Sequence, residues 1–132
     1  MNWGLDTTFL MRMLTEDPPD QAEIAKQWLS RCLADGKRPK VTDLVVMEAY
    51  FALQAHYQVP KREALGALRM LLESGDVEPV GFALDVLQKT HNLASSKPSL
   101  VDRVIHAQIR ALDAEMLTFE KAASKLPMTR VL

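Results

Sequence analysis

The spacing of hydrophobic positions changes several times along the chain, and each spacing predicts a different element. The apolar run at residues 2–6 ends in an acid, as a buried strand does when its last residue emerges at a sheet edge. We expect a helix directly after it. A second helix is predicted to start at Asp20, where Glu23 completes a capping pattern, and to end at Gly36. Its inward stripe consists of Ala25, Trp28, Leu29 and Cys32.

Two consecutive helices are predicted in the middle of the chain. From Thr42 or Asp43 to Tyr57 the sequence is apolar nearly all round, which is typical of a buried helix. Pro60 separates this helix from a more amphipathic one that starts at Lys61. The apolar stripe of the second helix holds Ala64, Leu65, Leu68, Leu71 and Leu72.

The last third of the chain alternates strand and helix patterns. Residues 76–80 predict a short strand, and helical spacing follows at Val80, Ala83, Leu84 and Leu87. Ser99 is the predicted N-cap of another helix, with Asp102 in the capping-box position. The residues expected to face inward from this helix are Val101, Val104, Ile105 and Leu112. Strands are predicted at residues 115–119 and, as an edge strand, at residues 129–132.

Short strands that alternate with helices predict an α/β fold. Because parallel neighbouring strands need a crossover connection, the helices are expected to flank a mainly parallel central sheet. The chain has 132 residues, and neither a linker nor an internal repeat interrupts it. We therefore expect one compact domain that comprises residues 1–132.

Charge and composition narrow the possible functions. The formal net charge of −1 argues against capture of nucleic acid by charge alone. The basic groups at residues 37–40 and 121–130 could meet phosphates, although such groups are usually solvated surface. No stretch approaches the length of a membrane span, and the N-terminal residues lack the basic start of a signal peptide. Cys32 is the only cysteine and is expected in the core, which suits a cytoplasmic protein without disulfides.

Four acids are expected at one edge of the predicted sheet. In a parallel sheet the carboxyl ends of the strands and the starts of the following helices share that edge. The acids are Asp6, Glu48, Asp102 and Glu120. Crowded carboxylates repel one another and lose hydration, and a divalent cation removes that problem. Oxygen ligands open to water suit Mg²⁺ or Mn²⁺, which commonly act on phosphate esters.

Each of these acids also has a purely structural interpretation. Asp102 could serve only as part of a helix cap, and Asp6 could cap the helix after the first strand. Glu120 could pair with Lys121 or Lys125 at a helix start.

Glu48 is the strongest single indication of a functional site. The residues one helical turn away are all apolar and offer the carboxylate no partner. They are Leu44, Val45, Phe51 and Ala52.

Four stretches together resemble PIN-domain ribonucleases of the virulence-associated toxin type across almost the whole chain. They read LDTTFLMR, TEDPPDQAEIAKQWL, VTDLVVMEAYFALQAHYQVPKREALGALRMLL and SLVDRVIHAQIRALDAEMLTFEKAASKL. The resemblance implies a three-layer PIN-like sandwich. It also implies that the metal-site acids are Asp6, Glu48, Asp102 and Glu120, with Thr8 and Thr118 as supporting polar groups. Arg12 matches the pattern of the family as well.

Three positions depart from the pattern of that family. Glu120 stands where an aspartate is usual, and its extra methylene shifts the carboxylate by more than ~1 Å. Ser99 stands where many members have another aspartate, so the site would hold one acid fewer. His106 replaces a small residue and is expected to be a surface or packing histidine rather than a ligand. These changes would suit a weakened or inactive member.

The resemblance implies hydrolysis of single-stranded RNA with one or two Mg²⁺ or Mn²⁺ ions, leaving 5′-phosphate and 3′-hydroxyl ends. It further implies a homodimer and an antitoxin protein that covers the site. The methionines of FLMRML could serve such contacts, although methionines at helical spacing are more often core. Two rival hypotheses are a PIN-like binding module without turnover and a purely helical interaction domain.

Overall fold

The computed structural model describes residues 2–132. The chain forms two compact units, one that ends at Val80 and one from Gly81 to Leu132. The first unit contains α1 (Thr7–Thr15), α2 (Pro19–Ala34), β1 (Lys40–Thr42), α3 (Asp43–Ala55), α4 (Lys61–Glu73) and β2 (Glu78–Val80). The second contains α5 (Ala83–Lys89), η1 (Leu93–Ser95), α6 (Leu100–Ala111), β3 (Met116–Thr118), η2 (Lys121–Lys125) and β4 (Thr129–Val131).

Strands β1 and β2 of the first unit pair in parallel, with Val41 opposite Pro79. The strand predicted at residues 2–6 is reduced to one parallel bridge between Gly4 and Lys40. Two backbone hydrogen bonds hold it, from the Leu5 N–H to the Lys40 carbonyl and from the Lys40 N–H to the Trp3 carbonyl. The segment therefore lies beside β1 and leads directly into α1, as expected.

The start predicted for the second helix is wrong. Helix α2 begins at Pro19, with Pro18 rather than Asp20 at the N-cap position. Proline suits a first helical turn because its missing N–H would have no intrahelical partner there. The predicted end is close to the observed one, since α2 ends at Ala34 and Gly36 adopts a positive φ of 74°.

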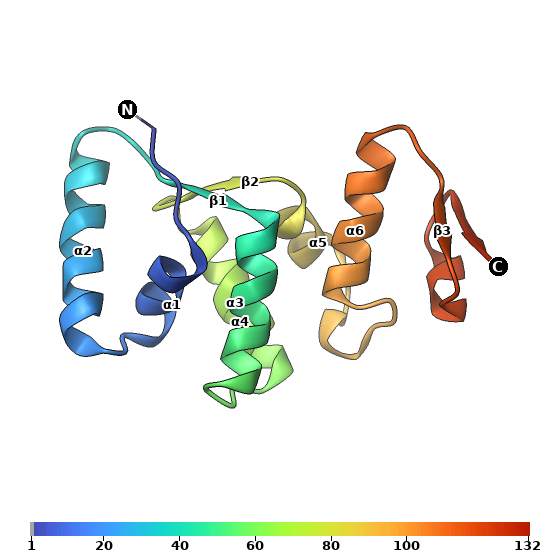
Figure 1. Ribbon diagram of the computed structural model, residues 1–132, viewed down its shortest axis with the longest axis horizontal. Helices are drawn as coiled ribbons and strands as arrows, with labels where there is room; N and C mark the ends of the chain where they lie inside the picture. The colour runs from blue at the N-terminus through green and yellow to red at the C-terminus, as the bar shows by residue number, and fades with distance from the viewer. Residues whose placement is uncertain (1) are drawn as a thin grey trace. The chain divides into compact units, whose positions relative to one another are not determined.

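Helix α3 is central to the apolar core of the first unit, because both α1 and α4 pack against it; α3 and α4 run side by side in Figure 1. Both helices are confirmed close to their predicted positions. Their buried apolar residues are Val46, Met47, Ala49, Tyr50, Leu53, Ala64, Leu65, Leu68 and Leu72. Helix α3 is nevertheless not buried all round, because Leu44 is 71% and Phe51 is 55% exposed. An all-apolar pattern thus predicted the helix but not which face it buries.

The second unit pairs β3 with β4 in parallel, with Leu117 opposite Arg130. Both predicted strands are therefore confirmed, and parallel strands in both units exclude a purely helical domain. Among residues 2–132 the strands form two two-stranded sheets. The mixed helices and parallel strands agree with a PIN-like α/β fold. One central sheet, the three-layer sandwich and a single domain stay predictions.

Helix α6 buries a different face from the one predicted. Of the residues expected to face inward only Val104 is buried, whereas Ile105 is 45% and Leu112 is 78% exposed. The buried positions are Leu100, Val104 and His106. His106 can be buried because its Nε2 lies 2.7 Å from the Pro127 carbonyl oxygen, which satisfies the ring nitrogen. No helix in the described part of the chain combines the length and apolar character that a membrane span requires.

Candidate functional site

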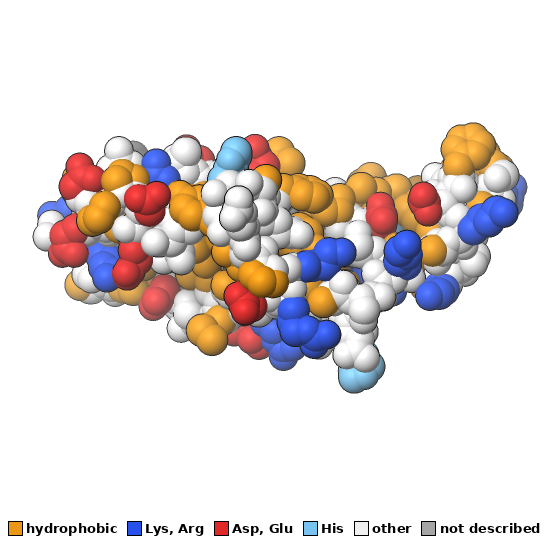
Figure 2. Space-filling view, turned by 90° about the horizontal axis from the view of Figure 1, so that it is seen from below, with side chains coloured by type: hydrophobic (Ala, Val, Ile, Leu, Met, Phe, Trp, Pro, Cys, Tyr) orange, Lys and Arg blue, Asp and Glu red, His pale blue; other side chains and the backbone are white. Residues whose placement is uncertain are grey.

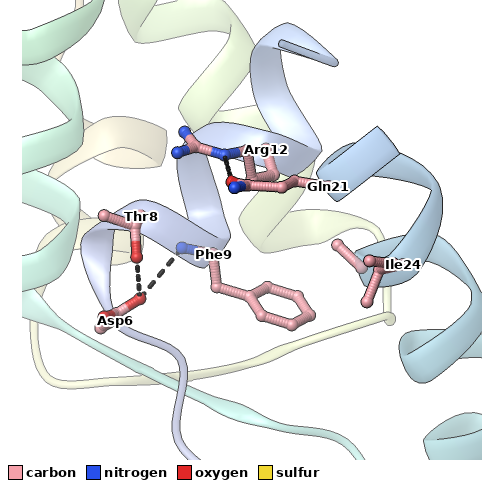
Figure 3. Close-up of a pocket in the computed structure, with 7 residues that line it drawn as sticks. Asp6, Thr8, Phe9, Arg12, Gln21 and Ile24 are labelled. Carbon is pink, nitrogen blue, oxygen red and sulfur yellow. Dashed lines mark hydrogen bonds between the residues drawn. The ribbon is translucent and has the colours of Figure 1, made fainter. Parts of the chain in front are cut away.

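Asp6 lies at the N-cap of α1 and is fixed there by two hydrogen bonds (Figure 3). Its Oδ1 accepts from the backbone N–H of Phe9 at 3.0 Å and from the Thr8 hydroxyl at 2.8 Å. These bonds, and more weakly the positive charge of Arg12, hold the pKa of Asp6 below its ordinary value. The capping role expected of Asp6 is confirmed. The same bonds keep an exposed carboxylate ionised, as a cation ligand must be.

Glu48 has a hydrogen-bond partner, although the sequence predicted none. The hydroxyl of Thr7 donates a 2.8 Å hydrogen bond to Glu48 Oε1. Glu48 is exposed, and the neighbouring Leu44 and Phe51 are exposed as well, so the carboxylate is not surrounded by buried apolar groups. The prediction failed because Thr7 comes from α1, 41 positions away, and helix periodicity reports only on neighbours in the same helix. The buried acid of α3 is Asp43, at 7% exposure.

The first turn of α1 contacts both candidate acids of the first unit, Asp6 and Glu48. Thr7 bonds to Glu48 and the next residue, Thr8, bonds to Asp6. Thr8 is therefore confirmed as a hydrogen-bond partner of Asp6, whereas the sequence reasoning overlooked Thr7. Two successive hydroxyl residues directly after a capping acid were the available signal. Each orients one carboxylate from the same rigid turn.

A pocket of about 340 Å³ opens beside Asp6, between α1 and α2. Its lining combines apolar and polar side chains, namely Asp6, Thr8, Phe9, Arg12, Gln21, Ile24 and Ala25. Arg12 Nε donates to Gln21 Oε1 at 2.7 Å, which links the two helices (Figure 3). The ring of Phe9 meets Trp28 edge to face with ring centres 5.7 Å apart. The sequence reasoning did not identify Gln21.

The two acids of the second unit are exposed. Asp102 lies in the first turn of α6, and Glu120 lies two residues after the end of β3, at the N-cap position of η2. In Figure 1, α6 begins at the same end of this unit at which β3 ends. Neither carboxylate makes a hydrogen bond or ion pair within residues 2–132. The Thr118 hydroxyl accepts from the Glu120 backbone N–H at 3.0 Å, so Thr118 fixes the chain and not the carboxylate.

The structural alternatives for these two acids find no support within the second unit. Ser99 occupies the N-cap position of α6, but its side chain makes no capping bond, so no capping box forms with Asp102. Lys125 Nζ donates to the Lys97 carbonyl at 3.1 Å instead of pairing with Glu120. His106 is a packing histidine, as expected. Because a carbonyl only accepts, its Nε2 carries the proton toward Pro127.

The donor chemistry of the acids fits a hard divalent cation, because exposed carboxylate oxygens are its usual protein ligands. Among the described residues, the four acids do not form the single cluster that the sequence predicted. Within residues 2–132, no three His, Cys, Asp or Glu side chains lie close enough together to hold a metal ion. Each unit presents two of the four acids, and those of the first unit are held by hydrogen bonds to α1.

The described residues thus combine helices, short parallel strands and exposed acids in both units. The family model of the PIN domain matches residues 5–127, which include all four acids. The chain belongs to the PIN domain family. PIN domains are generally nucleases that use divalent metal ions, and a nuclease of this type implies a nucleic acid substrate. Neither the curated proteins nor the solved structures yielded a match.

Proposed function

We propose that this protein is a metal-dependent endoribonuclease that cleaves single-stranded RNA. The observation that carries the proposal is the PIN domain match over residues 5–127, combined with an Asp6 carboxylate that hydrogen bonds keep ionised. Its proposed catalytic acids are Asp6, Glu48, Asp102 and Glu120. Asp6 and Glu120 occupy N-cap positions and Asp102 the first turn of α6, whereas Glu48 lies within α3.

The residues of the chain contribute by holding charge in place. Asp6 is fixed through Thr8 and the Phe9 amide, and Glu48 through Thr7. Neither has to reorganise when it binds a cation, which favours catalysis. When bound, Mg²⁺ or Mn²⁺ supplies a more acidic water and stabilises charge on phosphate oxygens. The exposed Asp102 and Glu120 carboxylates keep their oxygens open to the same type of ion.

We also propose that the protein is the toxin of a toxin–antitoxin pair, cytoplasmic and homodimeric. The resemblance in sequence supports this role, and the exposed Leu44 and Phe51 of α3 offer apolar surface for protein contacts. The methionine-rich segment contributes less than expected, because Met11 is only 5% exposed and belongs to the core. Co-expression with the product of the neighbouring reading frame tests the pairing, with copurification and loss of cleavage as the expected result.

Cleavage of single-stranded RNA by the purified chain tests the activity itself. With Mg²⁺ or Mn²⁺ we expect fragments with 5′-phosphate ends, and chelation by EDTA should stop the reaction. Asp6→Asn should lower the rate at least about 100-fold, because it removes the charge while retaining an N-cap side chain. Asp20→Asn, at an exposed acid of α2, is the matched control and should cleave normally. Cleavage that survives EDTA or Asp6→Asn would refute the proposed site.

The second candidate function is a PIN-like binding module with weak or no turnover. It is favoured by the absence, within residues 2–132, of a group of three metal-holding side chains. Glu120 and Ser99 in place of the aspartates usual for the resembling ribonucleases point the same way. RNA binding by the wild type without cleavage at any concentration of Mg²⁺ or Mn²⁺ would favour this candidate over the enzyme.

A further inference from the structure

The pocket between α1 and α2 lies beside Asp6 but contains groups that the proposed chemistry leaves unused. Arg12, Gln21, Phe9 and Ile24 line it together with Asp6. Its volume of about 340 Å³ falls in the range of small-molecule sites and suits one planar ring system better than a folded segment. The pocket therefore has the size of a binding site and lies next to a proposed catalytic residue, and its lining decides which ligand would fit.

The charges in the pocket favour a neutral occupant. The ionised carboxylate of Asp6 repels a phosphate, and the guanidinium of Arg12 repels a lysine or arginine from another protein. Apolar surface comes from Phe9 and from Ile24, whose side chain is 65% exposed. A flat, uncharged ring with hydrogen-bonding atoms along one edge matches this combination, and nucleobases are such rings.

Arg12 presents its hydrogen-bond donors in a fixed arrangement. Its Nε is occupied by Gln21 Oε1 at 2.7 Å, which orients the guanidinium plane (Figure 3). The two terminal nitrogens make no hydrogen bond within residues 2–132 and can donate to a ligand. Two parallel donors match two adjacent acceptors. Guanine offers that pair through O6 and N7 and cytosine through O2 and N3, whereas adenine has a donor beside N7. The two-ring guanine can also cover more of the apolar surface of Phe9 and Ile24 than cytosine can, and is therefore the better match.

We infer that this pocket holds a guanine base of the RNA substrate, with Arg12 reading O6 and N7 and Phe9 and Ile24 contacting the ring. Arg12 is then a specificity-determining residue, and Gln21 positions it. The inference rests on the proposed ribonuclease function and gives that function a sequence preference. RNA strands with an unpaired guanine near the scissile phosphate are the favoured substrates.

Binding in EDTA tests the pocket without cleavage. The probes are fluorescent oligouridine strands that carry one central guanosine, adenosine, cytidine, inosine or 7-deazaguanosine, and anisotropy gives the affinity for the full chain. Guanosine and inosine strands should bind roughly 5- to 150-fold more tightly than the adenosine strand, because both present O6 and N7. The 7-deazaguanosine strand should lose most of that advantage because it lacks the N7 acceptor. This comparison needs no variant and therefore no assumption about folding.

Variants then assign the preference to Arg12. Arg12→Lys keeps the charge but removes the two-pronged donor, so the advantage of the guanosine strand over the adenosine strand should vanish. The matched control Arg31→Lys, at an exposed arginine of α2, should leave both affinities unchanged. Guanosine binding should also change the fluorescence of Trp28, whose ring contacts Phe9.

The possible failures are distinguishable. Equal affinity for all strands, or a guanosine preference that survives Arg12→Lys, would overturn the inference. Uniform weakening of every strand in Arg12→Lys would identify a phosphate contact and overturn it as well. Binding of no strand would overturn it and leave the pocket to a protein segment. Guanosine-dependent binding without cleavage in Mg²⁺ would refute the ribonuclease and retain the pocket, whereas cleavage without base preference would do the reverse.

Discussion

The two units of the chain hold their proposed catalytic acids in different ways. In the first unit, Asp6 and Glu48 accept hydrogen bonds from Thr8 and Thr7. In the second, Asp102 and Glu120 have no such partner among residues 2–132. The charge balance differs too, because the first unit carries nine Lys and Arg against twelve Asp and Glu, and the second seven against five. One pair of acids is thus oriented before any ligand binds, whereas the other retains rotational freedom.

Lys and Arg side chains are visible across the second unit in Figure 2, on the face that the view shows. A net positive unit attracts phosphates, while the acidic first unit does not. We therefore expect the first unit to present fixed carboxylates and the second unit to add affinity for the RNA backbone.

The largest effect is expected from Asp102→Asn. If the free acid of the second unit is as necessary as the fixed one, cleavage should fall at least about 100-fold while the melting temperature stays unchanged. Asp113→Asn is the matched control, because this exposed residue has a positive φ of 57° that asparagine tolerates. Single-turnover cleavage assays and thermal melts measure both. Normal cleavage by Asp102→Asn would remove this acid from the proposed mechanism.

Thr7→Val should have the next largest effect, about tenfold on the cleavage rate. The substitution keeps the shape of the side chain but removes the hydrogen bond that orients Glu48. Thr15→Val, which removes a hydroxyl bonded to the Met11 carbonyl in the same helix, is the control and should leave the rate unchanged. An equal loss in both variants would mean that α1 had merely been weakened.

Glu120→Asp tests whether the glutamate at this position weakens the proposed activity. Shortening this side chain should raise the cleavage rate by roughly three- to tenfold, because it restores the position of the carboxylate usual in the resembling ribonucleases. The titration of activity with Mn²⁺ should shift to lower concentration. A lower rate would show that the surroundings of Glu120 have adapted to glutamate.

The smallest effect concerns stability and pH. Asp6→Ala should destabilise the fold by about 1 kcal/mol, since it removes the N-cap of α1. The folded-state pKa of Asp6 lies below its ordinary value of 3.8, so its contribution is present above that value. It should disappear as the pH falls through the lowered pKa, and the melting temperatures of wild type and variant should converge there. A constant difference at every pH would refute this account of the cap.

Local patterns predicted most of the elements but few of the contacts between them. The helix periodicities of α3 and α4 and the strand patterns of β3 and β4 were sufficient to predict these four elements, because each pattern depends on residues close in sequence. The bond between Thr7 and Glu48 joins residues 41 positions apart, and no periodicity reports on it. The prediction of which face of α6 points inward was also wrong, since burial of His106 depends on a carbonyl 21 residues away.

For the candidate site, too, local patterns predicted individual residues but not the contacts between helices. The capping role of Asp6 follows from an acid directly before a helix, and the structure confirms it. The pocket could not be foreseen, because Arg12 and Gln21 belong to different helices and meet only when α1 packs on α2. Patterns in the sequence identified the chemical groups, whereas packing between elements decided which of them meet.

The bond from the Phe9 amide to Asp6 has a consequence for spectroscopy. That amide proton points at the carboxylate whose state matters most for the proposed chemistry. Its chemical shift should therefore follow the protonation of Asp6, and its exchange with solvent deuterium should slow when a cation occupies the carboxylate and steadies the turn. A single backbone resonance, far easier to observe than a side-chain carboxyl, would then report on ion binding in the first unit without RNA or turnover.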